Sequence, residues 1–313
     1  MIDFRYHVVS LVAVFLALAL GVLLGTTQLN GAVLDDLRGQ VSGLTIEKRE
    51  LQADVRTLQG RAENDDTVTA ALAPNVVSGT LRDVTVVLVG TAQATDDTTD
   101  GVQRMLEQAG ARITGRVELT EDYADPQRAA DVKSFVTGGQ PSGFQLPVSD
   151  DAGVLSGALL SYALLGTRGG GANPEPATTS EVLSGFASLK MLRVASPQVT
   201  AADLAVVVTS GPVRGDDPAA RVRTLTDLVS ALDGAGRGAV VAGTAAAAGT
   251  NGLVTAIRDD RGLASAVSTV DDADRPVGQV ASVFALAQQS AGRSGQYGTA
   301  SGAEAPFPPT SSS

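Results

Sequence analysis

Residues 84–89 read VTVVLV, an apolar run interrupted only by Thr85. Such a run, rich in β-branched residues, is typical of a parallel strand that is buried on both faces. An apolar stripe of helical spacing follows over residues 102–109 and ends at Gly110, the residue type that most often terminates a helix. Residues 111–119 then have the composition of another strand. The sequence therefore predicts a strand, a helix and a strand in succession.

A second unit of the same kind lies further along the chain. Its strands are predicted at residues 204–208 and 239–242, and the helix between them carries Val222, Leu225, Leu228, Val229 and Leu232 at helical spacing. Two such units predict an α/β domain with a parallel sheet and right-handed crossovers. Residues 154–165 are apolar but too few to cross a bilayer, so we expect a core helix there.

We assign residues 80–290 to this α/β domain. Residues 169–176 read GGGANPEP and are predicted to form a loop. Gly, Ser, Pro and Thr dominate residues 291–313. Because such a segment buries little apolar surface, we predict a disordered tail from residue 291 onwards.

A coiled-coil stalk is predicted at residues 29–66, before the domain. Its a and d positions alternate at spacings of three and four, and they are Leu34, Leu37, Val41, Leu44, Lys48, Leu51, Val55 and Leu58, followed by Ala62. Val at a with Leu at d favours two parallel strands, and a lysine at an a position can fix register and oligomer number. We therefore expect a parallel homodimer. A helix folded back on its own domain and a groove for a partner helix are the alternatives.

A transmembrane anchor is predicted at residues 1–28. Residues 8–24 read VVSLVAVFLALALGVLL, and Val8, Phe15 and Leu24 mark the start, middle and end of the run. About 20 helical residues cross a hydrocarbon layer of roughly 30 Å. Arg5 precedes the run and two aspartates follow it, so the positive-inside rule predicts a cytoplasmic N-terminus and an extracytoplasmic domain. A cleavable signal peptide is the alternative, but its apolar region would be about 7 to 15 residues long, and here the small pair Ala17 and Ala19 lies inside the run.

Composition excludes several classes of function. The net charge is −11 and the pI is near 4.6, which argues against nucleic acid as a partner. Because the sole histidine is His7, the domain cannot contain a Ser-His-Asp triad, and we assign no catalytic residue. Residues 243–251 resemble a phosphate loop but have no lysine, so a tight turn explains these glycines and we assign no cofactor-binding residue. The sequence thus indicates a protein that is not an enzyme.

Metal-binding candidates are few. The acidic groups Asp96, Asp97 and Asp100 and Asp271, Asp272 and Asp274 lack the spacing of a calcium loop and are predicted to be solvated loops or helix starts. Copper prefers thiolate, thioether or imidazole, and the chain has no cysteine. Met105 and Met191 lie in apolar runs and are expected in the core. His7 remains the single candidate metal ligand, and the ligand count does not support copper as a cofactor.

The opening MIDFRYHVVSLVAVFLALALGVLLGTT, the heptads and the later DVTVVLVG together resemble the actinobacterial family named for mycobacterial copper transport protein B (MctB). The resemblance extends to about residue 298. It implies a cell-envelope protein linked to copper homeostasis, for which a channel role in the outer membrane has been proposed. It also includes SteB-like envelope proteins, which implies a SteA-like membrane partner or a peptidoglycan hydrolase as the protein partner.

Three hypotheses follow. The first is a membrane-anchored, coiled-coil scaffold or adaptor of the cell envelope, and the second is a direct component of copper export. The third is an enzyme or ligand-binding domain on an α/β fold, for which fold analogy alone argues. A membrane-spanning barrel would need strands of roughly ten residues that alternate between lipid and lumen, whereas the predicted strands are short and continuously apolar.

Overall fold

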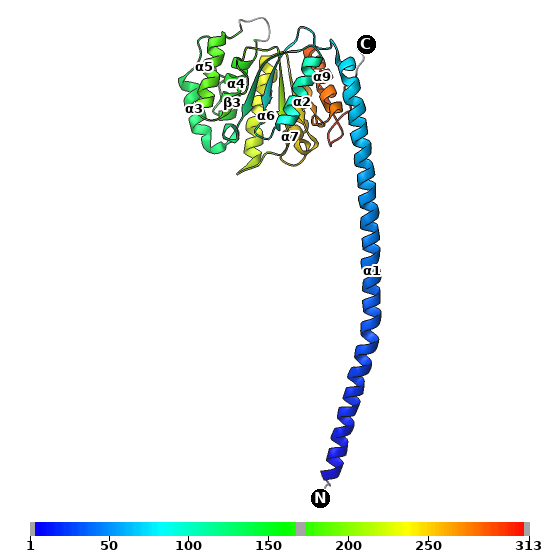
Figure 1. Cartoon of the computed structure of the whole chain (residues 1–313). Helices are drawn as coiled ribbons and strands as arrows, with labels where there is room; N and C mark the ends of the chain where they lie inside the picture. The colour runs from blue at the N-terminus through cyan, green and yellow to red at the C-terminus, as the bar shows by residue number, and fades with distance from the viewer. Residues whose placement is uncertain (1–3, 167–172, 310–313) are drawn as a thin grey trace. The chain divides into compact units, whose positions relative to one another are not determined.

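The computed structural model describes residues 4–166 and 173–309, and at residues 26–36 it describes the helical backbone alone. The chain divides into two compact units, residues 1–65 and residues 66–313. The first consists of most of helix α1, and the second is an α/β domain that includes the last turns of α1 (Figure 1). The side chain of Leu34 and residues 169–172 of the predicted loop at 169–176 fall outside the described part of the chain.

The two predicted strand-helix-strand units are present as β1-α2-β2 and β4-α6-β5. The strands are β1 Thr85–Gly90, β2 Arg112–Leu119, β3 Leu192–Val194, β4 Leu204–Thr209, β5 Ala239–Gly243, β6 Ser268–Val270 and β7 Gln296–Tyr297. The helices are α1 Phe4–Val77, α2 Asp96–Gln108, α3 Ala129–Gly138, α4 Ala152–Leu164, α5 Pro176–Ser188, α6 Pro218–Ala235, α7 Leu253–Asp259, α8 Arg261–Ala266 and α9 Pro276–Ser290. Short 3-10 turns lie at Glu121–Ala124, Pro126–Arg128 and Ala245–Ala248.

In the described residues the strands form one seven-stranded sheet in the order β3-β2-β1-β4-β5-β6-β7. Each neighbouring pair is parallel except β2 and β3, which are antiparallel. The predicted α/β class with a parallel sheet is confirmed. The antiparallel edge strand β3 was not predicted.

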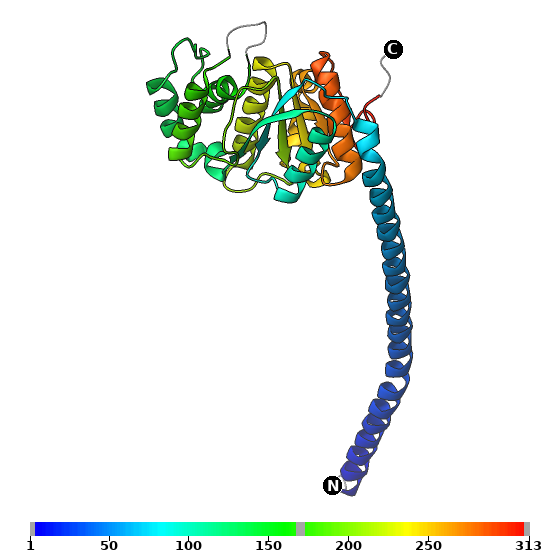
Figure 2. The same ribbon diagram turned by 45° about the horizontal axis from the view of Figure 1, so that its top comes forward.

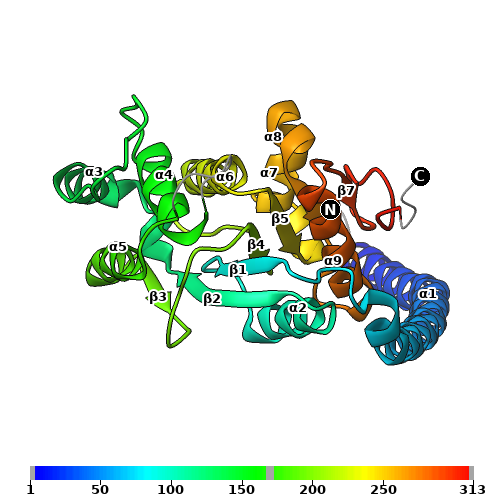
Figure 3. The same ribbon diagram turned by 90° about the horizontal axis from the view of Figure 1, so that it is seen from above.

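Helices cover both faces of the sheet, and alternate strand residues point to opposite faces. One apolar core contains Val87 and Val89 of β1 with α4, α6 and α7, and the other contains Val86 and Leu88 with α2 and α9. Helices on both sides of the sheet are visible in the turned views (Figures 2 and 3). The predicted core helix at 154–165 is α4, with Leu159 and Leu160 fully buried.

The end of the chain differs from the prediction. Residues 291–309 are ordered against the domain, and Gln296–Tyr297 form β7, which pairs with β6. Tyr297 is only 4% exposed, and its hydroxyl is hydrogen-bonded to Gln288 of α9. The prediction of a disordered tail from residue 291 is therefore wrong for this segment, because a few residues with long-range partners outweigh its polar composition.

Candidate functional site

The N-terminal part of α1 is long and apolar enough to cross a membrane. Residues 4–25 form a helical segment of 22 residues with a mean hydropathy of 2.8. The predicted anchor residues Val8, Phe15 and Leu24 are 45%, 65% and 59% exposed. A helix that is apolar on every side and uncovered by protein is suited to hydrocarbon. Length and composition thus support an anchor, while its orientation across the membrane stays a prediction.

The predicted coiled-coil seam lies on the same helix. Its described apolar residues are 45% to 65% exposed, and they are Leu37, Val41, Leu44, Leu51, Val55 and Leu58. Lys48 is exposed as well. Because these positions are continuously helical, their spacing places them along one side of α1. They form an apolar strip of the kind that packs against another helix, and we call these residues the seam.

Metal ligands do not gather in the described residues. No group of three or more His, Cys, Asp or Glu side chains there could hold a metal ion. His7 is exposed in the first turns of α1. Met105 and Met191 are 6% and 0% exposed in the two cores, as expected for residues that pack.

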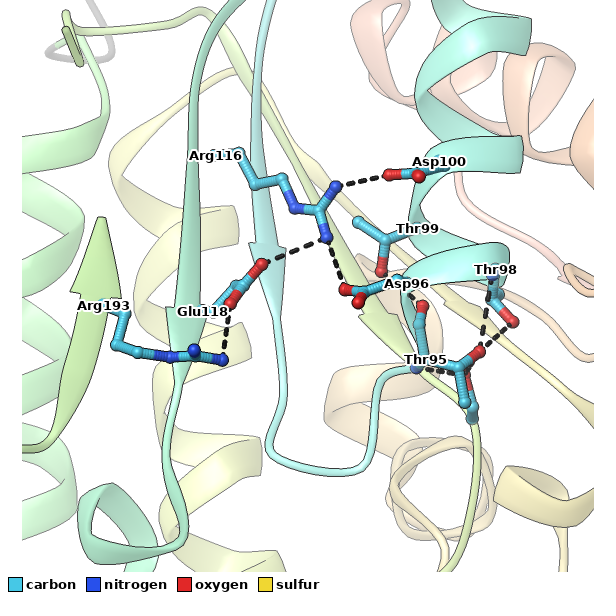
Figure 4. A network of polar contacts seen from close by, with 9 residues as sticks. Thr95, Asp96, Thr98, Thr99, Asp100, Arg116, Glu118 and Arg193 are labelled. Atoms are coloured by element: carbon cyan, nitrogen blue, oxygen red, sulfur yellow. Dashed lines mark hydrogen bonds and ion pairs between the residues drawn. The ribbon is translucent and has the colours of Figure 1, made fainter. Parts of the chain in front are cut away.

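The first acidic group belongs to a network around Arg116 of β2 (Figure 4). The Arg116 guanidinium contacts Asp100 and Asp96 of α2, the latter at 3.1 Å, and Glu118 at 3.0 Å. Glu118 in turn accepts a hydrogen bond of 2.8 Å from Arg193 of β3. Burial on its own would lower the pKa of Arg116, but the hydrogen bond with Asp100 and the three nearby carboxylates raise it.. This network ties α2, β2 and β3 together.

The second acidic group lies where the C-terminal segment meets the sheet. Asp271 is fully buried and forms an ion pair of 2.8 Å with Arg258 of α7. Its carboxylate also accepts hydrogen bonds from the backbone N–H groups of Thr299 and Ala300, at 2.8 and 3.1 Å. The prediction of a solvated loop is therefore wrong for Asp271, which holds the C-terminal segment in place.

Hydrogen bonds join the loops at the position in the sheet where α/β domains usually bind ligands. The strand order reverses between β1 and β4, and ligands typically bind outside the carboxyl ends of strands at such a point. Here the Thr95 N–H donates to Ser210 Oγ at 3.0 Å, and the Thr244 hydroxyl donates to the Ser210 carbonyl at 2.8 Å. Asp96 and Asp97 occupy the first turn of α2, where a bound phosphate would need the N–H groups and the positive dipole. The described residues therefore do not form a phosphate site at this point.

A pocket of about 450 Å³ lies between α3, α4 and α6. Buried Tyr123 and Ser156 are at its base, joined by a hydrogen bond of 3.4 Å. Burial raises the pKa of the Asp227 carboxyl at the pocket wall, and the nearby Asp151 charge raises it further. Asp151 itself caps α4 by accepting from the N–H groups of Gly153 and Val154. The pocket thus combines a helix-capping carboxylate with one carboxylate of raised pKa.

Comparison with known proteins decides the family. The family model described as "Copper transport outer membrane protein, MctB" matches residues 1–308. The chain belongs to the MctB family. Among MctB relatives, the "Copper transporter MctB" of Mycobacterium tuberculosis is 31% identical over 308 residues, which cover 97% of this chain and 98% of the relative. The protein of the same name from Mycobacterium leprae is 33% identical over 316 residues, with the same coverage.

The match confirms the family resemblance that the sequence indicated up to about residue 298. MctB proteins are named for copper transport and not for an enzymatic reaction. The sequence predicted the apolar helix, whereas the coiled-coil role of the seam stays a prediction. It missed the Arg116 and Arg258 networks, because their partners come from separate elements and no local spacing marks them.

Proposed function

We propose that the protein is a membrane-anchored adaptor of the cell envelope that acts in copper homeostasis without catalysing a reaction. The observation that carries this proposal is the uncovered seam, which follows a helical segment suited to a membrane. An apolar strip of regular a and d positions is stabilised when it packs against a second helix. The seam therefore joins two copies in a parallel dimer and selects helical partners.

Copper transport by such a protein is indirect. In the described residues one helix has the length and composition to span a membrane, and one span encloses no water-filled path unless several chains assemble. The described residues also lack a cluster of metal ligands, and both core methionines are buried. These observations favour a role in organising other envelope proteins, such as a SteA-like membrane partner or a peptidoglycan hydrolase, over a role as a copper conduit.

The seam is tested by placing charges on it. In the full-length protein in detergent micelles, the double variant Leu44→Asp/Leu51→Asp should convert dimers to monomers, because two buried carboxylates per chain would face the opposite seam. Mass photometry measures the outcome. Ile46 is a matched control, since it is apolar and 55% exposed on the same helix but lies outside the a and d positions. Dimers that persist in the double variant, or that dissociate equally with Ile46→Asp, would contradict the proposal.

Direct copper export is the competing function, and the family description favours it. It predicts tight, stoichiometric copper binding by the full-length protein, measured with Cu(I) under reducing conditions and with Cu(II) under oxidising conditions. The adaptor role predicts no such binding and an unchanged dimer in the presence of copper. If copper binds, the variant His7→Ala shows whether the single histidine contributes. A strain in which the gene is deleted should show altered copper tolerance under either function, and the seam variant should fail to restore it only under the adaptor role.

A further inference from the structure

The pocket between α3, α4 and α6 contains a carboxylate without a partner. Asp227 of α6 is half-buried at the pocket wall. Within the described part of the chain its carboxylate accepts no hydrogen bond and forms no ion pair. Partial removal of water from a charge is unfavourable when no opposite charge or hydrogen bond replaces the water. A cation from outside the chain would therefore be stabilised at Asp227.

The charges around Asp227 add to this preference for a cation. Its Oδ2 and the Oδ1 of Asp151 lie 2.8 and 3.1 Å from the position that a Cβ would take on Gly153, so the two carboxylates flank the same point of the pocket. Burial is the main cause of the raised pKa of Asp227, and the repulsion from Asp151 exceeds the attraction of Arg223. The electrostatic potential at Asp227 is thus negative in spite of the nearby guanidinium.

The base of the pocket offers an unused hydrogen-bond donor. Tyr123 is 3% exposed, and its hydroxyl accepts a hydrogen bond from Ser156 at 3.4 Å. Its own O–H donates to no acceptor among the described residues. Burial raises the pKa of Tyr123, and the Asp227 charge raises it further, so the hydroxyl keeps its proton and lies within electrostatic reach of Asp227. A buried donor of this kind is stabilised by an oxygen acceptor on a ligand.

The rest of the lining accepts a carbon skeleton. Pro126, Ala129, Val132 and Ala152 supply apolar surface to the pocket wall. A volume of about 450 Å³ lies in the range of pockets that bind small organic molecules. The pocket therefore combines apolar walls with two polar groups that have unused bonding capacity, and it suits a small organic ligand.

An organic ammonium group fits the two carboxylates better than a metal ion. No group of three or more His, Cys, Asp or Glu side chains in the described residues could hold a metal. An ammonium group needs only one or two carboxylates, because it donates charge-assisted N–H bonds to them. The ligand's oxygen belongs to a neutral group, since Asp151 and Asp227 would repel a ligand carboxylate.

We propose that this pocket binds a small organic amine that also carries a hydroxyl group, as amino sugars do. The ammonium group pairs with Asp227, and a ligand hydroxyl oxygen accepts the hydrogen bond of Tyr123. This inference goes beyond the adaptor role, because it assigns the α/β domain a ligand of its own. Neither the seam nor the membrane helix takes part in the binding.

The probe is D-glucosamine, and N-acetyl-D-glucosamine is its matched control, because acetylation removes the positive charge and keeps the other ring hydroxyls. Each sugar is titrated at pH 6.5 into the full-length protein in detergent micelles, and binding is measured by saturation-transfer difference NMR. We expect saturable binding of glucosamine at millimolar concentration and about tenfold weaker binding of the acetylated sugar. Absence of saturable glucosamine binding, or equal binding of the two sugars, would overturn the proposal.

A charge-removing variant assigns the ammonium contact. Asp227→Asn keeps the shape of the side chain, and it should weaken glucosamine binding about tenfold without lowering the melting temperature. Asp216→Asn removes the same charge at an exposed residue outside the pocket lining and should leave the affinity unchanged. An equal loss with both variants would mean that only the overall negative charge of the protein attracts the amine, which would contradict the assignment.

A second variant assigns the hydroxyl contact. Tyr123→Phe removes one oxygen, and Ser156 still donates to the Gly153 carbonyl, so the fold keeps its other bonds. The variant should weaken glucosamine about threefold and leave cyclohexylamine unaffected, because that amine has no oxygen to accept from Tyr123. Asp227→Asn should weaken both amines. If Tyr123→Phe weakens the two amines equally, or neither of them, the proposed pairing of Tyr123 with a ligand oxygen is wrong.

Discussion

Single residues of the C-terminal segment hold it on the sheet. Gly298 has a φ of +126°, which L side chains rarely adopt, and a Cβ at this position would overlap the Asp271 carboxylate. That carboxylate is buried with Arg258, and disturbing one partner of a buried ion pair leaves the other charge uncompensated. The residue is therefore glycine for two reasons at once, backbone conformation and space.

We expect Gly298→Ala to lower the free energy of unfolding by about 2–4 kcal/mol, since it combines a strained φ with displacement of Asp271. Thermal and denaturant unfolding of the purified protein measure this. Gly292 is the control, because its φ is +74° but nothing lies within 4 Å of its Cβ position. Gly292→Ala should cost about 1 kcal/mol. Equal losses for the two variants would mean that the contact with Asp271 contributes nothing.

A second residue gives a pH dependence. Burial and then the Asp151 charge raise the pKa of Asp227 in the folded protein. Between its ordinary and its raised pKa the folded state binds more protons than the unfolded state, so the contribution of Asp227 to stability falls as pH rises through this window. Asp227→Asn should therefore raise the melting temperature at pH 7.5, and the gain should shrink toward pH 4. Melting curves of the exposed control Asp216→Asn should show no such trend, and a gain that grows at low pH would contradict the assignment.

At the scale of elements, the sequence predicts the interior of the sheet better than its edges. The strands β1, β4 and β5 are continuous apolar runs, α2 and α6 have apolar stripes, and α4 is apolar on all sides, so local pattern is sufficient for these elements. The strands β3, β6 and β7 have two or three residues each. Hydrogen bonds from a neighbouring strand stabilise these short segments. Two or three residues are too few to show the alternation of apolar and polar residues by which a strand is predicted.

The same limit applies to the candidate sites. The predicted anchor is an unbroken apolar run, and the predicted seam is a set of regularly spaced apolar positions on the same helix. Both predictions need only the local sequence. The bond between Thr85 and Asp203, by contrast, joins residues separated by 118 positions, and the contact between Arg275 and Asp66 joins residues separated by 209. Nothing in the local sequence marks these partners, so networks of this kind become visible only in the folded chain.

The strand β7 gives a direct test of the ordered C-terminal segment. Ending the chain at Ser290 removes Tyr297 and the bonds of Asp271 to Thr299 and Ala300, and it leaves the edge of β6 uncovered. We expect a large drop in melting temperature and aggregation. Ending the chain at Pro309 keeps all of these contacts and should leave the melting temperature unchanged. A Ser290 truncation as stable as the full chain would show that the segment is dispensable.

At the scale of the whole molecule, the absence of cysteine allows its orientation to be measured. Val148 is fully exposed in the domain, so Val148→Cys introduces a single accessible thiol. If the domain is extracytoplasmic, a membrane-impermeant maleimide should label this thiol in intact cells whose outer layers admit the reagent. Asp3→Cys, before the apolar helix, should react only after the membrane is opened. The reverse pattern would show that the orientation is inverted.

The order in which the sheet is assembled has a consequence for biogenesis. Strand β1 is completed by β4, whose residues emerge from the ribosome more than a hundred positions later, and the last edge is closed by β7 near the end of the chain. Parallel sheets with distant pairings fold slowly, because their loops must close before any pairing contributes. A domain whose central strands are synthesised so far apart remains an unfolded chain until late in synthesis. In an exported protein, such an unfolded chain can pass through a translocation channel before the domain folds and becomes too wide for the channel.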